Sequence, residues 1–457
     1  MGEGVNRFTN YLSASFRVKI ALLSILILLL PALCHAFEPD IKKQRFENGL
    51  TLLHVERHEL PIVSINLLIR AGSRHEPPEK AGLASLTADM LLEGTKTLKS
   101  AEISETIEFF GASISANTDY DYTILSLHVL KKDLRELFRI FKEIIFSPVF
   151  PADMLKKKKS ILKTTLIKKE QEPSYIAMKT LRKELFKDHP YSRPVEGYPE
   201  TIKAIKRKDL MDFYKDFYKP EGSILVIAGD INQKEIEELI EDFKKWKFAG
   251  EVKKNGGKSK DAGSYSLSRS GPVIINKDLT QANILYGLPG ISRSDPDYYA
   301  ASVMNYILGG GGFSSRLVQK IRDDMGLAYD VSSYFTVNEE PGLFIIELQT
   351  KNSSAITAIK IIKEEIEQII KEPVSDEELE DAKAYLTGSL PRKIDTTKKI
   401  ADFLTIAEFY GLGDDYLKRY PEYIRAVTKD DIIKVAKRLL STEGLFVIVG
   451  RQSEIGE

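Results

Sequence analysis

Histidines at metal-ligand spacing are the first residues to test for chemistry, because a pair four residues apart on a helix can hold zinc. The chain has six: His35, His54, His58, His75, His128 and His189. None belongs to a His-x-x-Glu-His set. His54 and His58 are four apart, but residues 50–56 predict a strand, on which such residues stand about 13 Å apart. We therefore expect surface or strand-end histidines and no histidine metal site.

The stretch 82–95 keeps the frame of a metal-binding helix without its ligands. It reads Gly-Leu-Ala-Ser-Leu-Thr-Ala-Asp-Met-Leu-Leu-Glu-Gly-Thr. It closely resembles the zinc helix of the pitrilysin/insulinase-type peptidases, Gly-Leu-Ala-His-Phe-Leu-Glu-His-Met-Leu-Phe-x-Gly-Thr, in which two histidines bind zinc and the glutamate activates water. This chain has Ser85, Ala88 and Asp89 at those positions. A serine hydroxyl is a poor zinc ligand and alanine cannot accept a proton, so only Asp89 is an ordinary ligand.

The resemblance also locates the family's third zinc ligand, a glutamate on a later helix. An acidic-proline step, Glu172-Pro173, marks that helix, and counting back from it puts Thr165 at the ligand position, 76 residues after Asp89. All three ligands and the base are therefore missing. The resemblance predicts no metal in this chain.

A second motif of the same family follows a glycine run in the later part of the chain. The run consists of Gly309, Gly310, Gly311 and Gly312. It leads to Arg322 and Tyr329, seven residues apart, which the resemblance identifies as the family's catalytic arginine–tyrosine pair. Both side chains donate hydrogen bonds and could hold a substrate carbonyl and the oxyanion formed when water attacks it. The glycines could let the backbone approach a substrate peptide. Without the family frame, a glycine-rich turn and ordinary packing would be the better interpretation.

The resemblance covers residues 44–457, but this chain departs from the family on the strand that binds substrate. Active members carry Asn-Ala-x-Thr there, whereas this chain has Ser115-Ala-Asn-Thr118. Ser115 lacks the amide that would pair with a peptide backbone. Peptide binding by this strand is therefore in doubt.

A lysine run at 156–159 has no counterpart in the family. Helical geometry places Lys158 and Lys168 near the face of Thr165. One hypothesis is that positive charge replaces the metal there and holds Asp89. The alternative is a solvated basic helix or a contact with a partner.

Composition is that of an ordinary globular protein, with an export signal. The 457 residues are 43% hydrophobic and 29% charged, and 66 basic side chains balance 66 acidic ones. No net charge favours nucleic acid or an anionic membrane. Arg17 and Lys19 precede an apolar run of eleven residues and a small-residue segment, the order of a secretory signal cut after Ala36. The run is short for a bilayer span of roughly 20 residues, with an uncleaved anchor as the alternative.

An internal duplication organises the rest. The segments that begin Tyr198-Pro-Glu and Tyr420-Pro-Glu are 222 positions apart, and each leads through a helix to a Glu-Gly turn and an apolar strand. Amphipathic helices that end at Pro148 and Pro373 are 225 apart. A near-constant offset indicates two copies of one domain.

The predicted organisation is a signal peptide at 1–36, an N-terminal peptidase-like domain at 42–249, a polar linker at 250–264 and a C-terminal peptidase-like domain at 265–457. Strand patterns at 62–69 and 342–349 alternate with helices such as 134–145. The predicted fold class is α+β, with two homologous halves that each have a mainly antiparallel sheet and flanking helices. The resemblance implies that they are arranged as a clamshell.

Together these features predict a zinc-free subunit of a two-chain pitrilysin-type metallopeptidase. The chain would be inactive alone and would supply Arg322 and Tyr329 in trans to a zinc-bearing homologous subunit that hydrolyses peptides. We expect a periplasmic heterodimer with no cofactor in this chain, no nucleic-acid partner, and membrane contact only if the signal segment is retained. Two alternatives stay open: an autonomous metallopeptidase with an unrecognised ligand set, and a non-enzymatic peptide-binding or structural protein.

Overall fold

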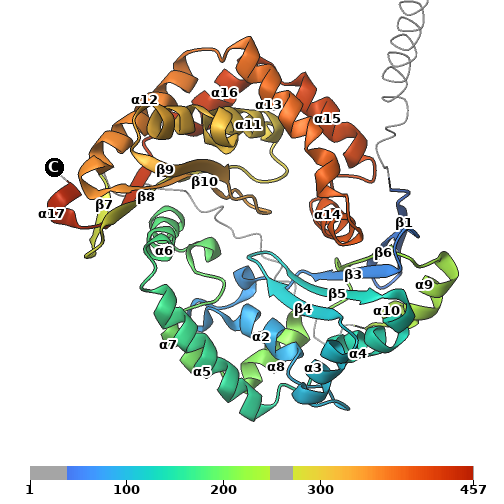
Figure 1. Cartoon of the computed structure of the whole chain (residues 1–457). Helices are drawn as coiled ribbons and strands as arrows, with labels where there is room; N and C mark the ends of the chain where they lie inside the picture. Colours follow the sequence, from blue (N-terminus) through green and yellow to red (C-terminus); the bar gives the residue numbers. More distant parts are fainter. Residues whose placement is uncertain (1–38, 248–270, 456–457) are drawn as a thin grey trace, which may run out of the picture. The chain divides into compact units, whose positions relative to one another are not determined.

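The structure is a computed structural model that describes residues 39–247 and 271–455 (Figure 1). The predicted signal peptide (1–36) and linker (250–264) lie outside the described residues. Within the described ranges, no helix is both long enough and apolar enough to cross a membrane.

The first half is built on a six-stranded sheet. Its strands are β1 (Lys42–Arg45), β2 (Thr51–Glu56), β3 (Ile62–Ile69), β4 (Ser113–Thr118), β5 (Thr123–Leu130) and β6 (Ile224–Gly229). Their order across the sheet is β1-β2-β6-β3-β5-β4. Neighbours are antiparallel except β2 and β6, which are parallel. The strand predicted at 62–69 is β3, with the same bounds.

The second half repeats this sheet without its first strand. Its strands are β7 (Val273–Asn276), β8 (Gln281–Pro289), β9 (Ala328–Phe335), β10 (Leu343–Lys351) and β11 (Leu445–Gly450). The order β7-β11-β8-β10-β9 matches β2-β6-β3-β5-β4 strand for strand. The single parallel pair of this sheet, β7 with β11, corresponds to the parallel pair β2 with β6 of the first sheet. The prediction of two homologous halves with mainly antiparallel sheets is confirmed.

Helices follow the strands in the same order in both halves. The first half contains α2 (Leu83–Leu91), α3 (Ser100–Phe109), α4 (Leu134–Phe146), α5 (Ala152–Lys169), α6 (Pro173–Phe186), α7 (Pro199–Ala204), α8 (Arg207–Phe217), α9 (Gln233–Leu239) and α10 (Glu241–Lys244). The second contains α11 (Tyr298–Asn305), α12 (Ala355–Lys371), α13 (Asp376–Gly388), α14 (Thr397–Phe409), α15 (Tyr416–Ala426), α16 (Lys429–Leu440) and α17 (Gln452–Ile455). The helix predicted at 134–145 is α4, whose apolar residues are buried at helical spacing.

The two copies of the Tyr-Pro-Glu motif form different helix starts. In the first copy α7 begins at Pro199, where a proline costs no intrahelical hydrogen bond. In the second, α15 runs through Pro421. Helix α15 therefore has a turn before its proline that α7 lacks. This turn is stabilised by packing, because Tyr416 is buried in the second core and accepts a hydrogen bond from Arg293 Nη2 at 2.5 Å.

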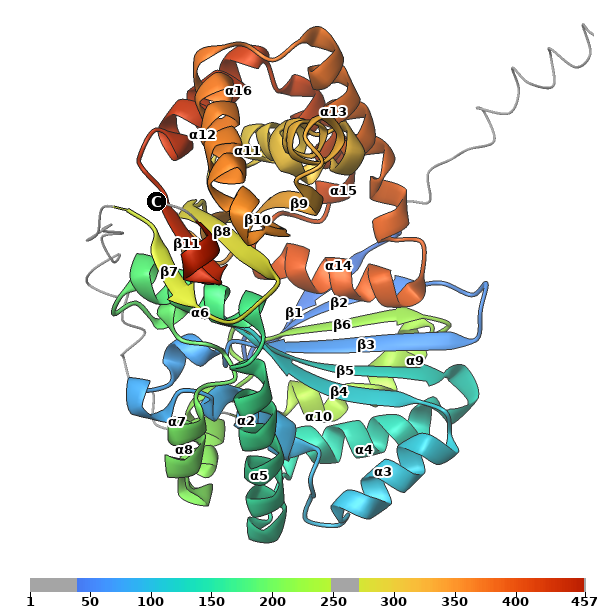
Figure 2. The same ribbon diagram turned by 60° about the vertical axis from the view of Figure 1, so that its left-hand side comes forward.

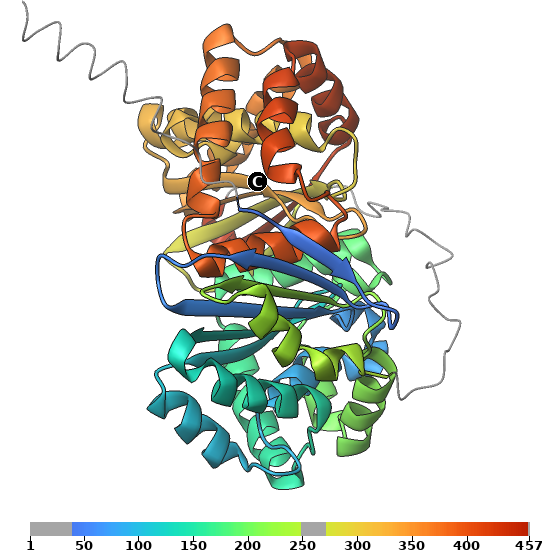
Figure 3. The same cartoon turned by 90° about the vertical axis from the view of Figure 1, so that its right-hand side faces the viewer.

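Each half covers one face of the other half's sheet with a helix. Helix α6 of the first half packs on β8 and β11, and α14 of the second half packs on β3 and β6 (Figure 2). Figure 3 shows α14 lying along the strands of the first sheet. The two helices are equivalent in the duplication, because their first residues, Pro173 and Thr397, are 224 positions apart. The repeat therefore exchanges one helix in each direction.

Apolar side chains form both exchange contacts. On the second sheet, Leu181 of α6 belongs to a cluster with Leu285 and Val447. A Cβ on Gly287 would stand 2.6 Å from Leu181, so the glycine leaves room for this side chain. On the first sheet, Leu404 of α14 packs among strand residues of β2, β3 and β6. Burial of these faces is the main stabilising contribution at the junction.

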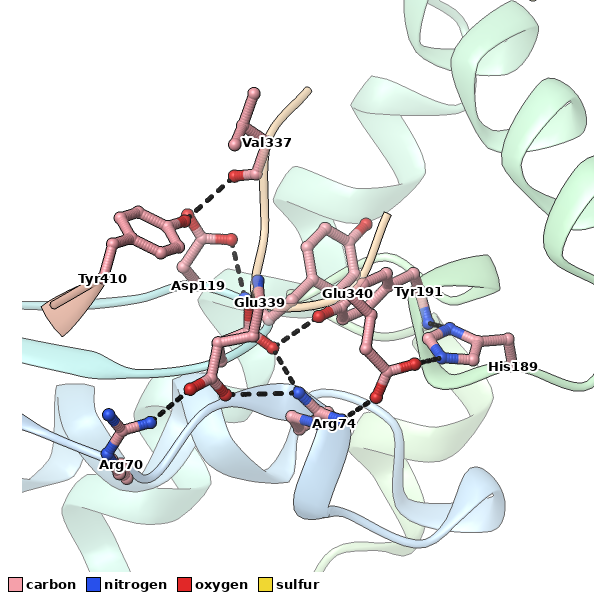
Figure 4. Close-up of polar contacts among 11 residues, drawn as sticks. Arg70, Arg74, Asp119, His189, Tyr191, Val337, Glu339, Glu340 and Tyr410 are labelled. Atoms are coloured by element: carbon pink, nitrogen blue, oxygen red, sulfur yellow. Dashed lines mark hydrogen bonds and ion pairs between the residues drawn. The ribbon is translucent and has the colours of Figure 1, made fainter. Parts of the chain in front are cut away.

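A polar cluster joins the β9–β10 hairpin to the first half; we call it the Asp121 cluster (Figure 4). Asp121 is 3% exposed. It accepts hydrogen bonds from Arg74 Nη1 (2.9 Å), Tyr191 Oη (2.6 Å) and the backbone N–H of Glu339 (2.9 Å). A buried carboxylate is tolerated only when it is paired and hydrogen-bonded in this way.

Two hairpin carboxylates complete the Asp121 cluster. Glu339 pairs with Arg70, and Glu340 pairs with Arg74. Nε2 of His189 lies 2.8 Å from Oε2 of Glu340. Burial alone would raise the pKa of Glu340, but the hydrogen bond with His189 and the charge of Arg74 outweigh it and lower the pKa.

Replacement of Glu340 by glutamine should make the junction less stable near neutral pH and less sensitive to acid. The lowered pKa means that this carboxylate stabilises the fold above its unfolded pKa, and that the stabilisation is lost as pH falls through the folded pKa. We expect Glu340→Gln to lower the free energy of unfolding by about 1–2 kcal/mol at pH 7. Urea unfolding at neutral pH and in acid measures this.

The matched control is Glu377→Gln, an exposed carboxylate on α13 with no ion pair in the described part of the chain. Equal acid sensitivity of the wild type and Glu340→Gln would contradict the role assigned to Glu340.

Candidate functional site

The predicted arginine–tyrosine pair lies where a helical turn leads into the edge strand of the second sheet. Arg322 is in a π-helical turn (Val318–Asp324), and Tyr329 is the second residue of β9. Between them Gly326 has φ +59°, and its N–H donates to the Arg322 carbonyl at 3.0 Å. This left-handed turn ends the helix and brings the two side chains together.

Arg322 is held between two exposed aromatic rings. Its Cζ lies 4.5 Å from the centroid of the Phe313 ring and 5.3 Å from that of Tyr329. The rings are 70% and 88% exposed, respectively. Stacking on ring faces leaves the edge of the guanidinium, with its N–H donors, open to an acceptor. Its one ion pair among the described residues is a long contact, 3.9 Å from Nε to Oδ1 of Asp323. The structure thus forms a surface donor pair from the two predicted residues.

A β-bulge presents Tyr329 to solvent. In the β9–β10 register, Leu348 faces Val331 and Thr350 faces Ala328, so Tyr329 and Asp330 lie opposite one residue. Both are exposed, which breaks the alternation of the strand. Bulges that re-aim a side chain are common beside active sites.

Packing inside the second half requires the first three glycines of the run, whereas Gly312 is open and has φ +59°. The run overlaps a π-helical turn (Tyr306–Gly310). A Cβ on Gly309 would lie 2.6 Å from Ser333 Oγ and 2.9 Å from Ser333 N, so no other residue allows this approach to β9. Arg316 anchors the end of the run through Nε and Nη2 to Glu378, at 2.6 and 2.9 Å. The role of the glycines in substrate binding stays a prediction.

The predicted metal-site positions lie on α2 and α5. Ser85, Ala88 and Asp89 are on α2, and Thr165 is on α5. Ala88 is 1% exposed and Thr165 is exposed. Across residues 39–247 and 271–455, no group of three or more His, Cys, Asp or Glu side chains could hold a metal ion. Zinc binds thiolate, imidazole and carboxylate, and of these four positions only Asp89 offers such a donor, so the set does not fit zinc.

A buried glutamate fixes the start of α2. Glu76 is 3% exposed and accepts hydrogen bonds from the backbone N–H groups of Gly82 and Ala84, both at 2.8 Å. Burial raises the pKa of this carboxyl to about 7. The helix that would carry a metal site is therefore still held in place, although its ligands are gone.

An ammonium lies beside the remaining α2 carboxylate. Lys158 pairs with Glu93 at 3.0 Å, and Ser100 donates to the other oxygen of Glu93 at 2.8 Å. Burial raises the pKa of Asp89; the charge of Lys158 opposes this shift and that of Glu93 adds to it. The hypothesis that lysine charge lies near Asp89 thus has structural support at Lys158, through Glu93. Lys168 is exposed and makes no ion pair in the described part of the chain.

Two residues of these sites were missed by sequence reasoning. Phe313, which stacks on Arg322, directly follows the glycine run. Its only signal in the sequence is that an aromatic residue lies within the same motif as Arg322. Glu93 lies four positions after Asp89, in the turn that follows α2, and that spacing could have been noticed.

The strand equivalent to the family's substrate strand is an edge strand. β4 (Ser113–Thr118) is the last strand of its sheet and pairs only with β5 among the described strands. Ser115 Oγ lies 3.4 Å from the amide nitrogen of Asn117. Ser115 has no side-chain amide, but Asn117, two residues along the same strand, carries one.

Two family models match the chain. Residues 52–198 match "Insulinase (Peptidase family M16)", and residues 204–386 match "Peptidase M16 inactive domain". The second match contains the glycine run, Arg322 and Tyr329, and the first contains the altered metal-site positions.

Relatives and solved structures agree with these matches. An uncharacterized zinc protease of Rickettsia bellii is 28% identical over 89% of this chain and 96% of its own length. A non-peptidase homolog of Helicobacter pylori is 29% identical over 76% and 78%, respectively. A crystal structure of a peptidase M16 inactive domain from Pseudomonas fluorescens has a TM-score of 0.81 and 27% identity, and covers 90% of this chain and 98% of that one.

Removal of the ammonium near Asp89 should destabilise the fold, more so at higher pH. Because the folded pKa of Asp89 is raised above 3.8, its ionisation in the folded state costs stability as pH rises through that pKa. Lys158→Met removes the opposing charge and raises the folded pKa further. We expect the free energy of unfolding to fall by about 1 kcal/mol at pH 8 and by less at pH 5.

Lys157→Met is the control, since Lys157 is an exposed neighbour without an ion pair in the described residues. Urea unfolding at both pH values compares the two variants. A Lys158→Met effect equal to that of the control at each pH would disprove the electrostatic role.

Proposed function

The chain belongs to the M16 (insulinase) peptidase family, and we propose that it is the zinc-free subunit of a two-chain metallopeptidase. In this proposal Arg322 and Tyr329 act in trans: they hold the carbonyl oxygen of a peptide whose hydrolysis is carried out at the metal site of a homologous partner. The partner's zinc supplies activation of the attacking water.

The observation that carries the proposal is the exposed Arg322–Tyr329 pair on a chain whose own metal positions hold no zinc ligand set. A tetrahedral intermediate places negative charge on the former carbonyl oxygen, and preorganised donors stabilise it most where water is excluded. Tyr329 is 88% exposed in this chain. A second protein surface over the pair would exclude water and make both donors effective.

Phe313 would serve the same reaction as a positioning residue. The guanidinium has several rotamers, and stacking on a ring selects among them. Together with the contact to the Tyr329 ring, this stacking restricts where the N–H groups point. This geometry pre-orients the donors before substrate arrives.

Export is part of the proposal. The order of basic, apolar and small residues in 1–36 supports a periplasmic location for the mature chain. Mass determination of the protein purified from cells would test cleavage after Ala36.

Activity should appear only when this chain is mixed with a partner that carries His-x-x-Glu-His. In that mixture, Arg322→Ala should lower kcat/KM by about 100-fold or more, because one oxyanion donor is lost. Tyr329→Phe should lower it as well, since only the hydroxyl is removed. Hydrolysis of a fluorogenic peptide by each chain and by the mixture measures this.

Arg425→Ala is the matched control, because Arg425 is an exposed arginine on α15 with no ion pair among the described residues. A mixture that remains fully active with Arg322→Ala would reject the trans mechanism. A role without any enzymatic partner would then be favoured.

Zinc content separates this proposal from an autonomous metallopeptidase. We expect substoichiometric zinc in the mature chain after dialysis, because serine, alanine and threonine replace ligands and base. Elemental analysis of the wild type beside Asp89→Ala provides the measurement. One zinc per chain, lost in Asp89→Ala, would show an unrecognised site and overturn the assignment.

A further inference from the structure

Helix α5 is exposed over much of its surface, although it has 18 residues. Only Leu155 and Leu166 on it are buried. Among the helices and strands, its main contacts are with α7 and α2. The burial pattern therefore leaves about half of the helix circumference facing away from the described fold.

The charge on this helix is strongly one-sided. It carries seven lysines and one acidic residue, Asp153. Three of the lysines have partners inside the fold. Lys158 pairs with Glu93, Lys169 pairs with Glu196, and Lys159 donates to the carbonyl oxygens of Lys203 and Ile205.

The other four lysines form what we call the basic face: Lys156, Lys157, Lys163 and Lys168. All four are exposed, and none makes an ion pair or hydrogen bond with the described residues. At 100° per residue they span one continuous arc of the helix. Two aliphatic side chains, Ile161 and Ile167, lie in the same arc and are 53% and 48% exposed.

The duplicated helix shows that this charge is not a property of the repeat. Helix α13, which occupies the equivalent place in the second half, begins Asp-Glu-Glu-Leu-Glu-Asp. The equivalent helix is therefore basic in the first copy and begins with an acidic run in the second, although the net charge of the whole chain is zero.

The basic face is next to the emptied metal positions. At 100° per residue, Thr165 and Lys158 follow Lys168 around the helix by about 60° and about 80°. Lys158 reaches Glu93 and the vicinity of Asp89 on α2. A polypeptide bound along α5 would therefore lie beside the positions that bind zinc in the family frame.

We propose that the basic face of α5 binds an acidic segment of the polypeptide substrate. Four unpaired ammonium groups complement carboxylates, and the two isoleucines complement apolar side chains between them. Lysine is a compact charge that tolerates many partner geometries, which suits an extended chain of variable sequence. The apolar residues favour a polypeptide over single-stranded nucleic acid, whose bases stack on aromatic side chains. This inference rests on the proposed function, since it names the class of peptide that the pair would take.

Binding to the mature chain alone tests the inference without a partner. The probe is a fluorescein-labelled synthetic peptide in which glutamates are interspersed with leucine and serine, together with the same peptide carrying glutamine for every glutamate. By fluorescence anisotropy, we expect the glutamate peptide to bind at least about tenfold more tightly at low salt, and the difference to shrink as salt screens the charges.

Lysine substitutions locate the binding surface. Lys163→Gln with Lys168→Gln should weaken binding of the glutamate peptide about five- to tenfold, since each exposed pair is worth up to about fivefold. Glutamine keeps the helix propensity of lysine, so the fold is preserved. The control is Lys434→Gln with Lys437→Gln, which removes two exposed lysines from α16 and should leave binding unchanged.

Three results would overturn the proposal: equal binding of the two peptides, equal loss in the α5 and α16 variants, and binding to phosphatidylserine vesicles without binding to the peptide. The last would assign the face to a membrane. In a mixture with a zinc-bearing partner, the α5 variant should raise KM for the glutamate peptide at unchanged kcat. If the peptide binds but no mixture hydrolyses it, this inference stands and the trans mechanism is rejected. If a mixture hydrolyses the glutamate peptide with the same KM for the wild type and the α5 variant, the trans mechanism stands and this inference is rejected.

Discussion

The exchange of α6 and α14 between the halves is the contact on which the rest of the structure depends. A sheet with helices on only one side exposes an apolar face, and a domain of about 200 residues must bury it against something. In this chain, the equivalent helix of the other copy covers that face. Leu181 enters the second sheet beside Gly287, and Leu404 lies on the first. Neither half is therefore complete by itself, although each has its own core on the opposite face.

This reciprocal burial determines where chemistry can occur. The faces covered by α6 and α14 are filled with side chains and cannot admit a substrate. Most of these side chains are apolar, and under α14 the buried Asn66 of β3 also donates hydrogen bonds to Asp402 and Thr405. Arg322 and Tyr329 instead lie at the edge of the second sheet, at the junction of a π-helical turn and a β-bulge. Both are irregular features that a structure keeps when they place functional side chains. The Asp121 cluster then ties the far end of β9 to the first half, so the strand that carries Tyr329 is held at both ends.

The sequence allowed the repeat, the fold class, the strand at 62–69 and the helix at 134–145 to be predicted, because apolar periodicity is a local property. The helix exchange could not be predicted, since an amphipathic pattern says that a face is buried and not against which element. The helical extension through Pro421 depends on the burial of Tyr416, a tertiary contact that overrides the local signal of proline. The bulge at Tyr329 and the stacking of Phe313 are also tertiary, because they require the β9–β10 register and the turn at Gly326.

Loss of metal ligands changes the electrostatics of the site as well as its chemistry. A zinc site concentrates positive charge, and its removal leaves any neighbouring carboxylate without compensation. In this chain Asp89 lies on α2 at a position where the family frame has histidine, Glu93 follows the helix, and Lys158 of α5 places a positive charge beside both. Lysine can place a charge there because its long side chain reaches across the helix contact while the stem packs. Lys158 makes this contact from α5, whereas Glu378 of the equivalent α13 forms a bidentate pair with Arg316, which anchors the end of the glycine run. The opposite charges of the two helices therefore coincide with different internal contacts: a lysine of α5 lies beside the carboxylates of the α2 region, and a glutamate of α13 holds the segment that leads to Arg322.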